Sequence, residues 1–135
     1  MCIRDSYHPD KGMRDPTRHQ WNGDLLLERL RRACVETSAE CEGAYVLGVT
    51  PLDLYLPEKD WRFALAVRNK DVAIVSSARM HGVLEGTVVA RMKKMVAKTI
   101  ALEYCGSAPS SDPRSIRYDR ILATGDLDAL DVGTW

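Results

Sequence analysis

The stretch that decides the fold is residues 87–118, TVVARMKKMVAKTIALEYCGSAPSSDPRSIRY. Its apolar side chains recur at i, i+3 and i+4, which predicts one long helix that begins after a turn at residues 82–86 and runs to about Tyr104. Gly106 suits the left-handed conformation that often follows a helix C-cap, so the helix should end just before it. Residues 107–113 are rich in serine and proline and are expected to form a loop.

Basic residues form a row on this helix. Arg91, Lys94 and Lys98 lie on a face away from the apolar stripe, and Lys93 adds a fourth cation. Such a row could bind phosphate or an acidic partner. Charged rows on the helices of a neutral protein are usually solvated, and we interpret this row in that way.

The rest of the chain predicts a helix followed by a small sheet. Asn22 is a good N-cap for a helix that carries leucines at helical spacing and ends in a polar loop at residues 36–43. Apolar runs predict extended segments at 44–49, 52–56, 62–67 and 72–76. The last two are separated by four polar residues and should form an antiparallel hairpin. Thr124 is expected to cap a final short helix at residues 125–130.

Composition limits the classes of partner. The chain has 45% hydrophobic and 28% charged residues, which is ordinary for a globular protein. Its formal net charge is zero, so no global field favours nucleic acid or an anionic membrane. No apolar run reaches the ~20 residues needed to span a bilayer. We therefore predict a soluble domain without nucleic-acid or membrane partners, whose oligomeric state is open.

The first residues, MCIRDS, resemble a translated sequencing adapter, so residues 1–6 are predicted to be an assembly scar. The natural N-terminus is then expected to be missing, and residues 7–135 are predicted to form a single domain. Cys34, Cys41 and Cys105 show neither zinc-ribbon nor disulfide-framework spacing. Cys34 and Cys41 could pair, but unpaired thiols in the cytoplasm are the preferred interpretation.

Four segments resemble archaemetzincins and the related matrixins, in the same order. The resemblance is carried by RHQWNGDLL (18–26), LGVTPLDLY (47–55), the hairpin from Phe63 through VAIVSSAR (72–79), and SDPRSIRY (111–118). It implies an α/β (α+β) zincin-like fold: a twisted mixed sheet, a backing helix, a long active-site-type helix and a small C-terminal subdomain.

The same resemblance implies a zinc motif, H-E-x-x-H-x-x-G-x-x-H, that this chain lacks. The positions of the ligands, general base and glycine hold Lys98, Thr99, Leu102, Cys105 and Ala108. An ammonium has no lone pair for a metal, and leucine has no donor atom. Thr99 cannot replace the glutamate that activates water. The methionine of the turn after the helix aligns with Arg117.

From this pattern we predict a zinc-less, catalytically inactive pseudo-protease with no cofactor and no catalytic or metal-binding residues. Its former substrate cleft would contain Asp112, Arg117 and Tyr118, and would bind a peptide or protein, with a strand added to the sheet edge. The alternatives are an active zinc-dependent hydrolase that uses other ligands and a purely structural domain of a longer protein. Fold alone does not choose among them.

Three sharper alternatives concern single residues. Lys98 could be a catalytic lysine with a lowered pKa, and Cys105 could pair with His81 as a nucleophile. Asp112 could join His8 or His19 in a new metal site. We favour the simpler interpretations, namely a solvated lysine, a small buried thiol and no metal site.

Overall fold

The structure is a computed structural model that describes residues 9–37 and 43–133. Its contacts divide the chain into two compact units, Met1–Ala78 and Arg79–Trp135, and each is described by itself. The proposed scar at residues 1–6 lies outside the described residues. A single domain over residues 7–135 stays a prediction.

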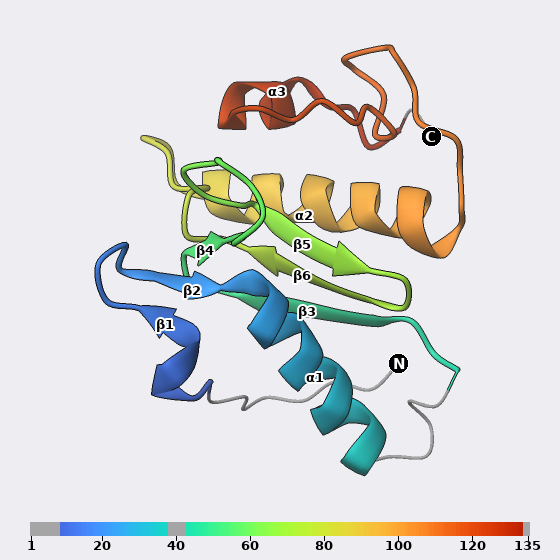
Figure 1. The fold of residues 1–135 in the computed structure, drawn as a ribbon. Coiled ribbons are helices and arrows are strands. Elements are labelled where there is room, and N and C mark those ends of the chain that lie inside the picture. The colour runs from blue at the N-terminus through green and yellow to red at the C-terminus, as the bar shows by residue number, and fades with distance from the viewer. Residues whose placement is uncertain (1–8, 38–42, 134–135) are drawn as a thin grey trace. The chain divides into compact units, whose positions relative to one another are not determined.

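The first unit contains two three-stranded sheets and one long helix (Figure 1). In the first sheet, β2 lies between an antiparallel β1 and a parallel β4. In the second, β6 lies between a parallel β3 and an antiparallel β5. The bounds are η1 Lys11–Met13, β1 Arg14–Asp15, β2 Gln20–Asn22, α1 Gly23–Thr37, β3 Val46–Thr50, β4 Leu54–Tyr55, β5 Ala66–Asn69 and β6 Val72–Ser76.

The central strand β6 confirms the strand predicted at residues 72–76. All five of its residues are buried, as expected for a continuous apolar run between two other strands. Asn69 pairs with Val72, so Lys70 and Asp71 form the two-residue turn of the predicted hairpin. The strand before this turn is shorter than expected: β5 starts at Ala66, and Ala64, two residues earlier, pairs with Leu54 of β4.

Helix α1 begins where the cap predicts and packs on the second sheet (Figure 1). The side-chain oxygen of Asn22 accepts hydrogen bonds from the backbone N–H groups of Asp24 and Leu25, at 3.1 and 3.3 Å. A Cβ on Gly48 of β3 would lie 2.7 Å from a methyl of Leu30, so glycine permits this close approach. One buried hydrophobic cluster of the unit contains Leu26, Leu27, Leu54, Ala64, Val67, Val72 and Ile74.

Cys34, near the end of α1, corrects one expectation. It is buried and disulfide-bonded, so the preferred interpretation of an unpaired thiol is wrong for this residue. The thiol pattern therefore no longer supports a cytoplasmic location, which stays a prediction.

The second unit is built on the long helix predicted from residues 87–118. Helix α2 spans Thr87–Thr99, the π-helical turn η3 continues it over Ile100–Tyr104, and α3 spans Thr124–Ala129. The N–H of Cys105 donates to the carbonyl oxygen of Ile100 at 2.9 Å, five residues back. Gly106 has φ +62°, which confirms the predicted helix end.

The wider turn η3 was not expected from the sequence. Periodicity predicts a regular helix through Tyr104, but the π-helical hydrogen bonds change the register of the side chains after Ile100.

The N-cap of α3 lies one residue before the predicted cap, Thr124. Ala123 is the N-cap, and the Asp126 carboxylate accepts from the N–H groups of Leu122 and Ala123 at 2.9 and 3.1 Å.

The helices within the described residues do not include one that is both long and apolar enough to cross a lipid bilayer. The mixed strand directions, the backing helix α1 and the long helix α2 confirm the predicted α/β class.

Leu26→Ala should lower the free energy of unfolding by about 2–5 kcal/mol, because the side chain is only 1% exposed and its removal leaves a cavity in the core. The matched control is Leu25→Ala, one position away but 46% exposed, which should change stability by less than about 0.5 kcal/mol. Urea denaturation of both variants measures the difference. Equal losses would contradict the assigned orientation of α1.

Candidate functional site

The basic row of α2 has a different role from the one predicted. Arg91, Lys94 and Lys98 do lie on one face, but each is bonded to the C-terminal segment after η3. The prediction of a solvated row is therefore wrong for these three residues, whereas Lys93 is exposed as expected. The sequence contains no local signal for these contacts, because the partners lie 20 to 37 residues away.

Arg91 makes the most extensive set of contacts. Its Nε and Nη2 donate to the two carboxylate oxygens of Asp128, at 2.8 and 2.7 Å, which is the bidentate geometry of strong Arg–carboxylate pairs. Its Nη1 donates to the carbonyl oxygens of Met80 and His81, at 3.0 and 3.1 Å. The hydrogen bonds with Arg91 lower the pKa of Asp128, and the same bonds raise the pKa of Arg91. One guanidinium thus ties together the segment before α2, α2 itself and α3.

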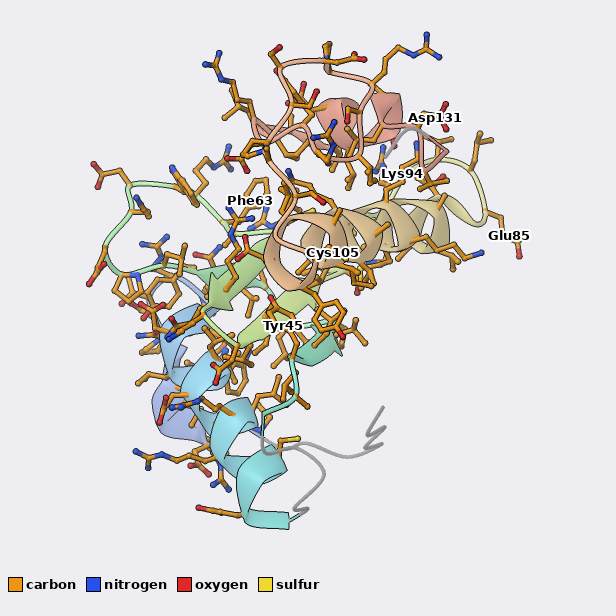
Figure 2. The ribbon with its side chains drawn as sticks, turned by 90° about the vertical axis from the view of Figure 1, so that its right-hand side faces the viewer. Tyr45, Phe63, Glu85, Lys94, Cys105 and Asp131 are labelled. Atoms are coloured by element: carbon orange, nitrogen blue, oxygen red, sulfur yellow. The ribbon has the colours of Figure 1, made fainter. Side chains whose placement is uncertain are left out.

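Lys94 extends the same contact by one helical turn. Its Nζ donates to the backbone carbonyl oxygen of Asp128 at 2.7 Å, close to the C-terminal end of α3. Figure 2 shows Lys94 on the side of α2 that faces the segment carrying Asp131. A cation is favourable near the last carbonyl groups of a helix, which carry partial negative charge.

Lys98 is the most deeply placed of the three cations. Its side chain is 3% exposed, and its Nζ donates a hydrogen bond to the carbonyl oxygen of Tyr118 and lies 3.6 Å from a carboxylate oxygen of Asp119. A buried ammonium requires such partners, because isolated charge is costly to remove from water. Lys98 is thus a structural cation that binds α2 to residues 118–119.

The other positions singled out by the resemblance offer little chemistry. Thr99 is buried, and its hydroxyl donates to the carbonyl oxygen of Met95 at 2.8 Å within the same helix. Leu102 is half-buried in η3, and Ala108 is exposed. The carbonyl oxygen of Ala108 accepts from Nη1 of Arg117 at 2.7 Å.

The three candidate cleft residues are not gathered into one site. Tyr118 lines a pocket of about 360 Å³ together with Pro109, Ser110, Ser111, Asp119 and Arg120. Arg117 and Asp112 do not line it. Asp112 is exposed, and its carboxylate accepts from the N–H of Arg114 at 2.9 Å, as in a turn. Their assignment to a cleft therefore stays a prediction, and the pocket is a feature that sequence reasoning missed.

The sharper alternatives are not supported by the geometry of the second unit. Cys105 is exposed, so the expectation of a buried thiol is wrong. Cys105 follows the long helix, whereas the carbonyl oxygen of His81 is bonded to Arg91. At 1.5 Å per residue the helix from Arg91 to Cys105 spans roughly 20 Å, too far for a nucleophile pair. His8 lies outside the described residues. Within the described residues, no group of three His, Cys, Asp or Glu side chains gathers as a metal site would require.

Comparison with solved structures shows that this fold is similar to those of archaemetzincins and of a zinc-dependent peptidase. No protein-family model and no curated protein matches the chain. A zinc-dependent peptidase from Methanocorpusculum labreanum is similar, with TM-score 0.81 and 22% identity over 98% of this chain and 79% of that one. Archaemetzincin from Methanopyrus kandleri gives 0.74 and 21%, over 92% and 64%. Archaemetzincin from Archaeoglobus fulgidus, complexed with malonate, gives 0.68 and 21%, over 91% and 70%. The chain has an archaemetzincin-like, metallopeptidase-like fold, as predicted.

These neighbours correct the prediction that the protein has no cofactor. One of them is described as a zinc-dependent peptidase, so zinc is the cofactor toward which the fold points. The side chains at the corresponding helix positions do not fit this ion: the Lys98 ammonium is bonded to Tyr118, and Leu102 has no donor atom. No chemical step through a metal is therefore derived from these residues.

The ion pair between Arg91 and Asp128 should make the free energy of unfolding decrease at acidic pH. Because the folded-state pKa of Asp128 is lowered from its usual 3.8, its contribution is fully present above that pH and is lost as pH falls through the lowered pKa. Asp128→Asn should remove this part of the pH dependence. Thermal melts between neutral pH and about pH 2 measure it, with Glu58→Gln, an exposed acid in the first unit, as control. Identical profiles for the two variants would contradict the assignment.

Lys98→Met should destabilise the protein by about 1–3 kcal/mol, because the Tyr118 carbonyl oxygen loses a charge-assisted hydrogen bond. Methionine preserves much of the apolar stem, so packing changes little. Lys93→Met, on the exposed side of the same helix, should be nearly neutral. Chemical denaturation compares the two. A Lys98 variant as stable as the wild type would show that desolvation of the ammonium cancels its bonds.

Proposed function

We propose that this chain is a peptidase-like domain that binds an extended peptide and does not hydrolyse it. The observation that carries the proposal is the state of Thr99, which occupies the position where the resemblance places the general base. Its hydroxyl is buried and donates to the Met95 carbonyl oxygen, and a threonine hydroxyl cannot accept a proton from water near neutral pH. Hydrolysis of a peptide bond by an activated water needs such a base.

The neighbouring positions support the same proposal. Lys98 is held by Tyr118 and Asp119, so its ammonium serves the architecture of the unit rather than an attacking nucleophile. The scaffold around these positions is retained, as the likeness to peptidase structures indicates. A retained scaffold without a general base is more consistent with recognition than with turnover.

The outer edge of β5 is the most suitable place for a peptide strand. In an antiparallel pair, alternate residues direct their backbone groups to opposite sides. The N–H of Ser76 donates to the carbonyl oxygen of Leu65 at 2.8 Å, so Leu65 and Val67 face β6. Ala64 and Ala66 then face outward. Ala64 already donates to the Leu54 carbonyl oxygen of β4 at 2.8 Å, and Ala66 offers the next N–H along this edge.

An active zinc-dependent peptidase is the second candidate, because a similar solved structure is described as that type of enzyme. The peptide-binding and the peptidase proposals predict different outcomes in a cleavage assay. The purified chain, incubated with excess zinc and a pool of fluorescence-quenched random peptides, should leave the peptides intact on our proposal. Cleavage that a chelator abolishes and zinc restores would establish the second candidate instead.

Ala66→Pro should abolish peptide binding without unfolding the protein. Proline removes the outward N–H but leaves the ladder between β5 and β6 intact, and edge strands tolerate proline in this position. The matched control is Ala66→Val, which keeps the N–H and should bind normally. Retention of labelled random peptides measures binding, and circular dichroism checks the fold. Undiminished binding by the proline variant would exclude this edge.

A further inference from the structure

We propose that the pocket between residues 109–111 and 118–120 binds a carboxylate group of the peptide. This inference deepens the proposed function and rests on it, because it names the part of the ligand that the second unit would recognise. The pocket is lined by Pro109, Ser110, Ser111, Tyr118, Asp119 and Arg120.

The walls of the pocket are fixed relative to each other by backbone pairing. Ser110 and Tyr118 form a parallel bridge, and the N–H of Ser110 donates to the carbonyl oxygen of Arg117 at 3.1 Å. The wall formed by residues 118–120 is also held by Lys98, whose Nζ donates to the Tyr118 carbonyl oxygen. A site whose walls are already paired loses little conformational entropy on binding a ligand.

The size of the pocket suits a chemical group rather than a whole peptide. Its volume of about 360 Å³ is at the lower end of the range for small-molecule sites, roughly 300–1,000 Å³. It can accept one side chain or a chain end. The rest of a peptide would bind outside this pocket.

The lining residues provide donors for an anion. Ser110, Ser111 and Tyr118 each carry a hydroxyl, and the guanidinium of Arg120 matches a carboxylate in bidentate geometry. The Ser110 oxygen accepts from the N–H of Asp112 at 3.1 Å, which leaves its proton to donate. These donors suit a ligand with several hydrogen-bond acceptors, such as a carboxylate, and an apolar ligand would leave them unpaired.

The charge balance also favours an anion. Asp119 is the acidic residue of the lining, and the Lys98 ammonium lies 3.6 Å from its carboxylate. Lys98 thus offsets the charge of Asp119, and Arg120 remains as a net positive charge at the pocket. A cation would meet the like charge of Arg120, while the opposite charge of Asp119 is already offset by Lys98, so the same lining disfavours a positively charged group.

Peptide carboxylates come from two sources, the chain end and acidic side chains. Three peptides of one sequence separate them: amidated and free of Asp and Glu, the same with a free C-terminus, and amidated with one central Glu. Fluorescence anisotropy with the full chain measures each dissociation constant. We expect one or both carboxylate peptides to bind at least about tenfold more tightly than the first, as for a charge-assisted hydrogen bond.

The variant Arg120→Gln should remove this preference. The matched control Lys93→Gln makes the same charge change at an exposed position on α2, outside the pocket lining, and should retain it. Both side chains are exposed, so both variants should fold, and equal melting temperatures check this. Equal binding of the three peptides, or a preference that survives Arg120→Gln, would overturn the carboxylate site while leaving peptide binding intact.

A different result separates this inference from the proposed function. If none of the peptides binds, the proposed peptide binding fails, and glutarate alone then probes the pocket by amide NMR shifts at Ser110, Ser111 and Tyr118. Shifts that Arg120→Gln abolishes would support the carboxylate site. Absent shifts, or stronger shifts with inorganic phosphate than with glutarate, would refute it.

Discussion

The second unit depends on the bidentate pair between Arg91 and Asp128. This guanidinium fixes three separate segments: the carbonyl groups before α2, helix α2 itself and the carboxylate of α3. Lys94 and Lys98 continue the contact along the same face, to the Asp128 and Tyr118 carbonyl oxygens. Packing of the apolar face gives a helix most of its stability. The polar face of α2 is therefore available to hold the loop-rich segment that follows it.

This row has consequences for function. Lys98 contacts Tyr118 and Asp119, which also line the small pocket. The same two residues therefore take part in the structural role of the cation and in the proposed recognition of a carboxylate. The fold is similar to those of archaemetzincins and of a zinc-dependent peptidase. Lys98 and Thr99, however, which stand where the resemblance places a ligand and the general base, use their side chains for hydrogen bonds within the unit. Scaffold and site therefore convey different information about this chain.

Sequence reasoning succeeded where local rules govern structure. The Asn22 cap, the buried run of β6, the hairpin turn after Asn69 and the helix end at Gly106 follow from residue type and spacing, and each is present. It was less accurate where neighbours compete for the backbone. Ala64 pairs with Leu54 of β4 and β5 starts only at Ala66, and the turn η3 widens a helix whose periodicity looks regular.

The sequence by itself determined the order and type of the elements from α1 onward except for η3, the apolar faces, and the absence of the familiar zinc motif at residues 98–108. Only the tertiary structure decided the environment of each charge. Arg91 and Asp128 are 37 residues apart, and spacing cannot predict that they meet. A lysine on a polar face is normally solvated, and Lys98 is buried because a carbonyl group and a carboxylate from a distant segment satisfy its ammonium. The pocket at Tyr118 likewise exists only because two loop segments pair.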